Sequence, residues 1–254
     1  MAEPRSKTAA RLAESPIADG GTAVEEWTGW GHDFPCLSLD DCPGLTVVAP
    51  HPDDETLGLG ATIAALCAAG VDVQVVSVSD GEAAYPGLDR AGRAKLKALR
   101  WAEVRRSMRL LGARDPVRLE MPDGELAQCE SELTDRIASL LADLPAGGWC
   151  ATTWRGDGHP DHEAVGRAAA AATAATGATL VEYPVWMWHW ARPRDPTVPL
   201  ERARRVRLTA QALETKNLAA QCFPTQTQSA PNGYPVLPPA VLQRLLAVGE
   251  VVFV

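Results

Sequence analysis

Short apolar runs alternate with amphipathic stretches along most of the 254-residue chain. Residues 45–49 and 73–79 are rich in β-branched side chains, and the stretch 55–69 between them has the length and spacing of a helix. A strand, a helix and a second strand in this order predict two parallel strands joined by a right-handed crossover. The alternation continues and predicts an α/β fold with a Rossmann-like, mostly parallel sheet and helices on both faces. Further helices are expected over 91–111, 130–144, 162–176, 210–221 and 239–247, and further strands over 117–119, 149–154, 179–183, 204–209 and 250–254.

The first 22 residues break this pattern, because they are small and polar and include proline and glycine. We expect residues 1–22 to form a disordered or loosely attached extension and residues 23–254 to form one domain. The chain has no apolar run of about 18 residues, so no membrane span is expected. Its start lacks the apolar core of a signal peptide.

Six cysteines are spread along the chain without a CxxC pair. Cys67 and Cys150 lie in apolar stretches, which predicts buried thiols. Cys36 and Cys42 are close enough in sequence for a disulfide, and this is the alternative to six free thiols. The expected compartment is the reducing cytoplasm.

The net charge of -8 argues against binding to a nucleic-acid backbone, since proteins of that class display a basic face. The hydrophobic content of 46% is enough for a sizeable core. These values are compatible with an enzyme that acts on a small molecule.

Two clusters of histidine and aspartate follow predicted strands. His51, Asp53 and Asp54 come directly after the strand 45–49, and His159 and His162 come after the strand 149–154. In open α/β sheets, ligands bind beyond the carboxyl ends of the strands. The two clusters are therefore expected to meet in one crevice, although they lie about a hundred residues apart.

Together the clusters offer the ligands of an open catalytic zinc site, which has three protein ligands and one position for water. His51 and Asp54 are three residues apart at a helix start, where both can face one ion. His162, in the first turn of the next helix, is the better third ligand. Asp53 is then left to act on water, and His159 to act as an acid or on an oxyanion. The alternatives are a plain helix cap for the aspartates and a structural role for the histidines. Fe(II), Co(II) or Ni(II) could occupy the same ligand set.

The segments APHPDDE (49–55) and GDGHPDH (156–162) resemble those of the PIG-L/LmbE-like zinc-dependent N-deacetylases. Shorter matches at 79–82, 100–103 and 121–124, and a late match at Lys216 and Gln226, extend the resemblance over about residues 45–228. The resemblance implies zinc bound by His51, Asp54 and His162, with Asp53 as general base and His159 stabilising the oxyanion. It also implies sugar contacts from Arg100 and Asp123.

One position departs from the mycothiol-pathway branch of this family. That branch has a tyrosine two residues before the first histidine of the second motif, and this chain has Asp157 there. The difference argues against the mycothiol precursor as substrate.

Trp186, Trp188 and Trp190 occupy alternate positions. In an extended segment they would share one face, so Trp186 and Trp188 are predicted to form a substrate wall that stacks on sugar rings. A buried aromatic core is the alternative. The proline-rich stretch 223–239 is either a loop over the active-site mouth or a contact in a homo-oligomer.

We therefore expect a zinc-dependent hydrolase that removes an N-acetyl or other N-acyl group from an amino sugar, such as an N-acetylglucosamine compound, or from its conjugate. Its only expected partner is that small-molecule substrate, apart from a second copy of itself. The alternatives are an amidase acting on a larger thiol or peptide-like conjugate, and a catalytically silent binding module.

Overall fold

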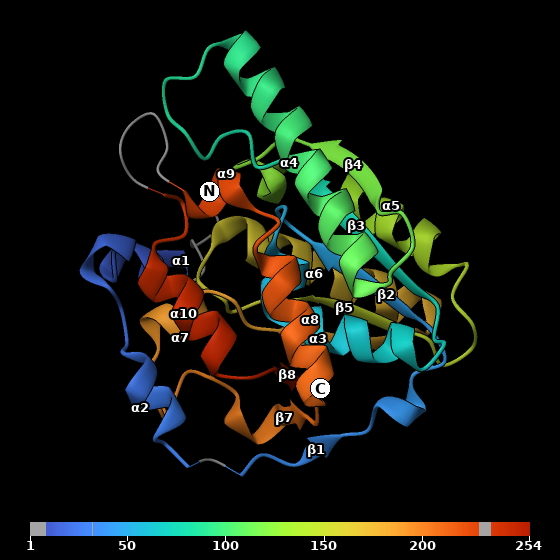
Figure 1. Ribbon diagram of the computed structural model, residues 1–254. Coiled ribbons are helices and arrows are strands. Elements are labelled where there is room, and N and C mark those ends of the chain that lie inside the picture. Colours follow the sequence, from blue (N-terminus) through green and yellow to red (C-terminus); the bar gives the residue numbers. More distant parts are fainter. Residues whose placement is uncertain (1–8, 32, 229–234) are drawn as a thin grey trace, which may run out of the picture.

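A computed structural model describes residues 9–31, 33–228 and 235–254 of the protein. Its centre is an eight-stranded sheet with the order β1-β7-β8-β6-β5-β2-β3-β4 (Figure 1). β8 runs antiparallel to β6 and β7, and all other neighbouring strands are parallel. The predicted fold, a mostly parallel α/β sheet, is confirmed. The strands are β1 Cys36–Leu37, β2 Leu45–Ala49, β3 Val73–Ser79, β4 Val117–Met121, β5 Trp149–Thr153, β6 Thr179–Tyr183, β7 Ala203–Val206 and β8 Val251–Phe253.

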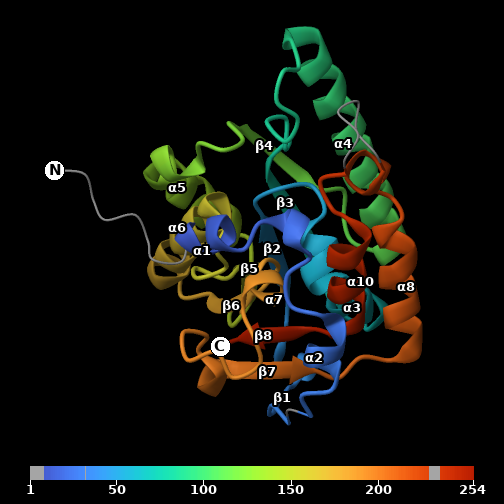
Figure 2. The same cartoon turned by 90° about the vertical axis from the view of Figure 1, so that its left-hand side faces the viewer.

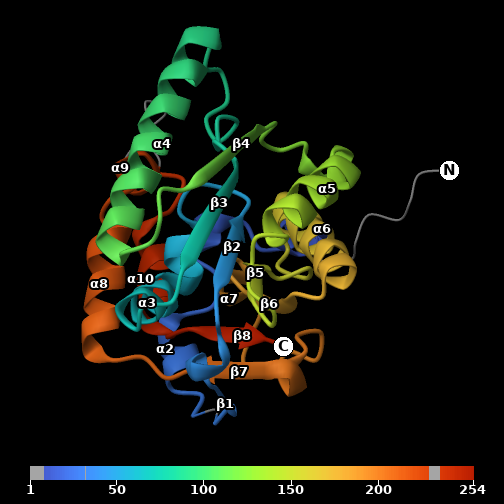
Figure 3. The same cartoon turned by 90° about the vertical axis from the view of Figure 1, so that its right-hand side faces the viewer.

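Helices cover both faces of the sheet (Figures 2 and 3). One face carries α3 (Asp54–Ala68), α4 (Arg90–Leu111), α8 (Ala210–Ala220) and α10 (Pro239–Ala247), and the other carries α5 (Glu130–Leu141) and α6 (Pro160–Thr176). The remaining elements are short: α1 Ala9–Glu14, η1 Ile17–Asp19, α2 Val24–Thr28, η2 Leu39–Asp41, η3 Leu126–Gln128, α7 Met187–Trp190, η4 Leu200–Arg202 and α9 Pro224–Thr227. In the described ranges, none of the helices combines the length and the apolar character needed to cross a membrane.

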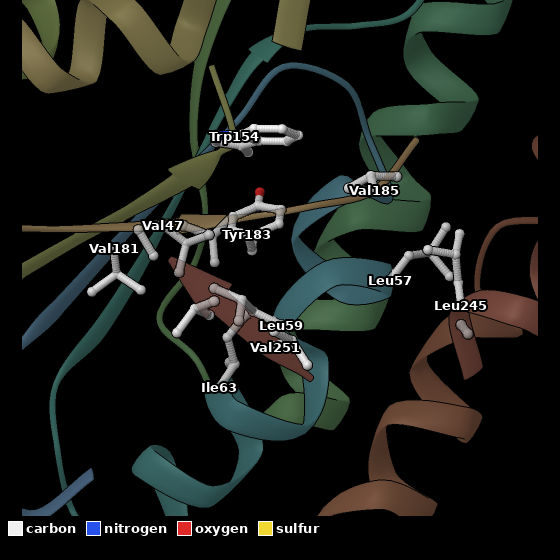
Figure 4. Packing of buried hydrophobic residues seen from close by; sticks show 14 of the residues in the cluster. Val47, Leu57, Leu59, Ile63, Trp154, Val181, Tyr183, Val185, Leu245 and Val251 are labelled. Atoms are coloured by element: carbon white, nitrogen blue, oxygen red, sulfur yellow. The ribbon is translucent and has the colours of Figure 1, made fainter. Parts of the chain in front are cut away.

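The two-sided cover explains the uninterrupted apolar runs of the central strands. All five residues of β2 and all five of β5 are buried, as expected for parallel strands packed on both faces. On the α3 side, Val47 and Val181 of the sheet pack near Leu59 and Ile63 of α3 (Figure 4). This core fixes the carboxyl ends of β2 and β5, where the two histidine clusters begin.

Helix α3 is broken near its start, because Leu59 has non-helical backbone angles (φ -134°, ψ 15°). The N–H groups of Ala61 and Thr62 donate to the buried carboxylate of Glu250, each over 2.8 Å. Lys216 Nζ donates to the same carboxylate over 2.9 Å. A buried acid–base pair from the C-terminal part of the chain therefore caps the second half of α3, beyond the break at Leu59.

The N-terminal segment departs from the prediction. Residues 9–22 were expected to be loosely attached, but they form α1 and η1 and make hydrogen bonds with His189 and Arg244. The segment is too polar to fold alone, and its partners lie more than 160 residues away, so local composition did not indicate its docking. Residues 1–8 lie outside the described part of the chain.

Two smaller expectations are also corrected. All six cysteines are free thiols, so the Cys36–Cys42 disulfide is not formed. Cys150 is buried as predicted, whereas Cys67 is half-buried. The tryptophan segment forms helix α7 with Trp186 as its N-cap rather than an extended strand, so Trp188 projects from a different side than Trp186 and Trp190.

Candidate metal centre and active-site cavity

The two histidine clusters meet at the carboxyl ends of β2 and β5, which are neighbouring parallel strands. His51 Nδ1 lies 3.2 Å from His162 Nε2 and 3.2 Å from Asp54 Oδ2. His162 Nε2 lies 3.2 Å from the same Asp54 oxygen. Three ligand atoms from separate parts of the chain thus form a nearly equilateral triangle, which we call the His51–Asp54–His162 triad.

The dimensions of the triad fit a tetrahedral metal ion. Metal–ligand bonds of about 2.0–2.1 Å require neighbouring ligand atoms to be about 3.3 Å apart, close to the 3.2 Å observed. The charge of the site also favours a metal cation, because Arg100 is the only side chain among the described cavity residues that is always cationic. Six acidic side chains surround the three imidazoles: Asp53, Asp54, Glu55, Asp123, Asp157 and Asp161.

Carboxylates orient both imidazoles of the triad. The other ring nitrogen of His51, Nε2, lies 3.2 Å from Asp123 Oδ1 and 3.3 Å from Asp161 Oδ2. His162 Nδ1 lies 2.8 Å from Asp157 Oδ2. Each histidine can donate one ring N–H to a carboxylate and keep the other nitrogen free for the metal, the usual arrangement of metal-binding histidines.

Asp157 is a functional residue that sequence reasoning did not identify as such. Its side chain is fully buried, and besides His162 it accepts the backbone N–H groups of Val185, Trp186 and Met187 over 2.8–3.0 Å. The available signals were its place inside the second motif and the tyrosine that one branch of the family has at this position. Asp161 has a similar bridging role, because it accepts the N–H groups of Gly124 and Leu126 and so places Asp123 beside His51.

The acidic surroundings change the proton affinity of the triad. Burial alone would lower the pKa of His51 and His162, but neighbouring carboxylates outweigh it. The pKa of His51 is raised well above its usual value, mainly by Asp123 and Asp161. Asp54 and Asp157 raise the pKa of His162 to about 9. Burial would raise the pKa of Asp54, but His162 and His51 lower it far below its usual value. A cation at the triad takes the place of the protons on these two histidines.

Two other sets of side chains lie close enough to share an ion: His51 with His159 and His162, and His51 with Asp123 and Asp161. The first would omit the Asp54 carboxylate, which is 3.2 Å from both of its neighbouring histidine nitrogens. The second uses the nitrogen of His51 that already faces two carboxylates. The triad is therefore the set that uses the Asp54 carboxylate and leaves the second ring nitrogen of each histidine to a carboxylate.

Asp53 has a strained backbone, with φ 116° in a region that side chains rarely adopt. It precedes the first turn of α3, and the cavity reaches its side chain although the residue is only 4% exposed. Burial raises the pKa of Asp53 well above its usual value, and the neighbouring Asp54 and Glu55 raise it further. A carboxylate held in this way is a strong proton acceptor.

His159 is held as a neutral ring with a defined tautomer. It caps α6, and its Nδ1 accepts the backbone N–H of Asp161 over 3.2 Å. The proton of the neutral ring must then be on Nε2, where it can be donated. Burial and the neighbouring His162 and His51 lower the pKa of His159 to about 3, which keeps the ring neutral.

A cavity of about 570 Å³ opens beside the triad. His51, Asp53, Asp54 and His159 line it, and so do the predicted substrate-binding residues Arg100, Asp123 and Trp186. His162 is fully buried beneath them. Trp188 is not among the described residues that line the cavity, because it packs against Trp27 with ring centroids 4.9 Å apart. The prediction that Trp188 belongs to the wall is therefore not supported.

Arg100 is the main polar group of the cavity wall. It is 1% exposed, and its Nη1 donates to Gly81 O over 2.6 Å. Its Nε and Nη2 are buried without a hydrogen-bond partner among the described residues. Gly81 has φ +66°, and a Cβ there would lie 1.9 Å from Arg100 Nη1, so only glycine fits. The proline-rich stretch also reaches the cavity, since 235–238 line it and Gln226 of α9 donates to Pro52 O.

Comparisons with known proteins agree with this geometry. A diacetylchitobiose deacetylase of Thermococcus kodakarensis is 29% identical over 129 residues, which cover 50% of this chain and 48% of that protein. The chain thus spans about half the length of this relative. A 1D-myo-inositol 2-acetamido-2-deoxy-alpha-D-glucopyranoside deacetylase of Mycobacterium sp. (strain JLS) is 27% identical, with 80% of each chain covered. The crystal structure of a conserved protein from Thermus thermophilus superposes with a TM-score of 0.56 at 26% identity, covering 79% of this chain and 84% of that one.

The family model matches residues 46–173, which include both histidine clusters and the whole triad. The matched region is half of the chain. The protein therefore belongs to the PIG-L family, described as GlcNAc-PI de-N-acetylase.

Proposed function

We propose that the protein is a zinc-dependent N-deacetylase that hydrolyses the N-acyl group of an amino sugar or amino-sugar conjugate. The observation that carries the proposal is the His51–Asp54–His162 triad, whose ligand atoms are 3.2 Å apart and lie beside a cavity. Family membership and the amino-sugar substrates named for two relatives support the reaction type. Zinc is the metal that suits two imidazoles and one carboxylate with an open position.

His51, Asp54 and His162 would hold the metal. When bound, such a metal polarises an amide carbonyl and makes a water molecule more acidic. Asp53 takes the proton from the attacking water, because its carboxylate faces the cavity next to the triad. The water oxygen forms the new bond to the carbonyl carbon, and the C–N bond then breaks.

Two residues handle the charges that this reaction creates. His159 donates its Nε2–H to the carbonyl oxygen as negative charge develops there. Asp53 returns its proton to the leaving nitrogen. The products are a free carboxylate and an amine, and no other reactant is needed.

Arg100 and Asp123 would bind the sugar. The two unpartnered nitrogens of Arg100, Nε and Nη2, offer N–H donors to hydroxyl oxygens. Asp123 lines the cavity while it also holds His51, so a substrate contact at this carboxylate would be coupled to the metal centre. Trp186 provides an aromatic surface on the same cavity.

The test is an amine-release assay on N-acetylglucosamine and its methyl glycoside, with metal-loaded and chelator-treated protein. We expect zinc to restore the release of glucosamine after chelation. Asp53→Asn should bind zinc with near-normal affinity but lose about 10²–10⁴-fold in kcat, whereas His162→Ala should lose the metal itself. The base assignment is wrong if Asp53→Asn keeps near-full turnover.

We infer that the enzyme works in a reducing compartment such as the cytoplasm. The six free cysteines support this, since two of them, Cys36 and Cys42, are only six residues apart and unpaired.

A further inference from the structure

The N-terminal arm, which we define as residues 9–22, lies outside the family match and forms part of the catalytic cavity. Leu12 of α1 and Ile17 and Ala18 of η1 line the same cavity as His51 and Asp53. Leu12 and Ile17 are half-buried, because they also pack against the hydrophobic core. The arm therefore presents apolar side chains to the place where substrate must bind.

Hydrogen bonds with Arg244 and His189, which we call the latch, hold the arm in this position. Arg244 Nε donates to Thr22 O over 2.6 Å, and Arg244 Nη2 donates to Gly20 O. The N–H of Thr22 donates to His189 O over 2.9 Å. His189 Nε2 donates to Ser15 O over 3.1 Å, so its Nδ1 is free to accept from Arg244 Nη1 at 3.3 Å.

The latch depends on close approach at Gly21. This residue has φ +64°, and a Cβ there would lie 2.4 Å from His189 Nδ1 and 2.5 Å from His189 O. Its neighbour Gly20 also has a positive φ, +80°, but a Cβ there would meet nothing within 4 Å. Substitution of either glycine would therefore strain the backbone in the same way, but only a side chain at position 21 would also collide with His189.

The cavity has two kinds of wall, supplied by different elements. The charged and imidazole groups next to the triad come from the segments after β2, β4 and β5, and Arg100 of α4 and Gln226 of α9 add further polar groups. The apolar groups come mainly from the arm, the loop after β6 and the segment before α10, joined by one residue of α3. The cavity's leucine, isoleucine, valine and tryptophan side chains, which we call the apolar wall, are Leu12, Ile17, Leu57, Val185, Trp186, Val236 and Leu237.

Apolar side chains that face a solvent-filled cavity gain free energy when a hydrocarbon group displaces the water. A sugar with its hydroxyl groups matches Arg100 and Asp123, but it leaves the apolar wall hydrated. A substrate that covers the apolar wall must therefore have a second, apolar part besides the sugar.

We propose that the arm completes a hydrocarbon-binding subsite, and that the natural substrate is an N-acylated amino sugar carrying an apolar group. This inference rests on the proposed deacetylase function. The apolar group is either an acyl chain longer than acetyl or an apolar aglycone, because both would bring methylene groups to the same wall.

Two substrate series separate these sources. One varies the acyl chain of N-acyl-glucosamine from acetyl to octanoyl, and the other varies the alkyl group of N-acetylglucosaminides from methyl to octyl. In one of the series, kcat/KM should rise about fourfold per methylene until the subsite is filled. A rise in the first series identifies an acyl-chain subsite, and a rise in the second identifies an aglycone subsite.

Arm variants then test where the subsite lies. Gly21→Ala and the double variant Leu12→Ser/Ile17→Ser should flatten the dependence on chain length, measured within each variant as the ratio of kcat/KM for the longest and shortest substrates. Gly20→Ala is the matched control for Gly21→Ala, and Leu218→Ser, at an exposed leucine on α8, is the control for lost apolar surface. Both controls should keep the wild-type ratio.

The outcomes distinguish the two proposals. Active enzyme with no chain-length dependence in either series would overturn the subsite and leave the deacetylase function intact. A chain-length dependence that survives in Gly21→Ala and Leu12→Ser/Ile17→Ser would overturn the role of the arm. Calorimetric binding of hexyl and methyl β-glucoside gives a readout without catalysis. Tighter binding of the hexyl compound, with no amine released from any substrate, would overturn the deacetylase function and support the subsite.

Discussion

Replacing Asp157 by asparagine should weaken metal binding although Asp157 is not a proposed ligand. The carboxylate accepts four hydrogen bonds, from His162 Nδ1 and the N–H groups of residues 185–187. Asparagine has nearly the same shape but only one acceptor oxygen. If the oxygen takes the Oδ1 position, His162 and Trp186 lose their acceptor; if it takes the Oδ2 position, Val185 and Met187 lose theirs.

The size of the effect follows from these losses. If the hydrogen bond to His162 changes from charge-assisted to neutral, the cost is about 1 kcal/mol; if the donor is left facing an amide NH₂ group, the cost is about 1–3 kcal/mol. Loss of the carboxylate that orients a metal-binding histidine reduces metal affinity by about 10–100-fold. The protein should also unfold at a lower denaturant concentration, since at least one buried N–H loses its acceptor.

Competition with a chromophoric chelator measures the zinc Kd, and denaturant unfolding of the metal-free protein measures the stability change separately. Asp143→Asn, at an exposed aspartate, is the matched control. An Asp157→Asn protein with wild-type zinc affinity would refute the reasoning, because it would show that the orientation and basicity of His162 do not depend on its buried partner.

Three further predictions concern charge. Lys216→Met should lower the free energy of unfolding by about 3–5 kcal/mol in urea titrations, because Glu250 would remain buried without its 2.9 Å partner; a loss below about 1 kcal/mol would contradict this account. Zinc affinity should rise with pH up to about pH 9, since the raised pKa values of His51 and His162 mean that binding releases their protons; calorimetry in buffers of different ionisation enthalpy counts the protons, and a count of zero would contradict it. Burial and Arg244 lower the pKa of His189 below 6.5 in the folded protein, so its contribution to stability should be complete above that pH and be lost as pH falls below it. Between pH 8 and 5, the free energy of unfolding in urea should therefore depend more steeply on pH in the wild type than in His189→Gln. Equal pH dependences in the two proteins would show that His189 does not titrate on unfolding.

The meeting of the two histidine clusters could be predicted from the sequence because it depends on a topological rule. Each cluster follows an apolar run at a strand end, and parallel strands bring their carboxyl ends to one edge of the sheet. The proposed ligands His51 and Asp54 also belong to one helix start, where local spacing determines geometry. Most element bounds were predicted within a few residues for the same reason, since they depend on local periodicity.

The features that escaped prediction depend on contacts between distant segments. Asp157 gains its role from the N–H groups of 185–187, and backbone donors leave no mark in a sequence. The arm is fixed by Arg244, more than 220 residues away. The tryptophans at alternate positions were ambiguous because a short run cannot separate an extended segment from a helical turn; Trp186 reached the cavity and Trp188 did not.

In the function that we propose, catalysis and substrate choice depend on different parts of this chain. The triad, Asp53 and His159 all lie within residues 46–173, the part that the family shares. The apolar wall takes six of its seven residues from outside that part, in the arm, the loop after β6 and the segment before α10. Asp157 connects the two, because one carboxylate orients His162 and also fixes the backbone of Trp186. Substitutions in the apolar wall can therefore change which substrate is accepted without moving the proposed metal ligands, provided that Asp157 still holds His162 and the backbone of Trp186 in place.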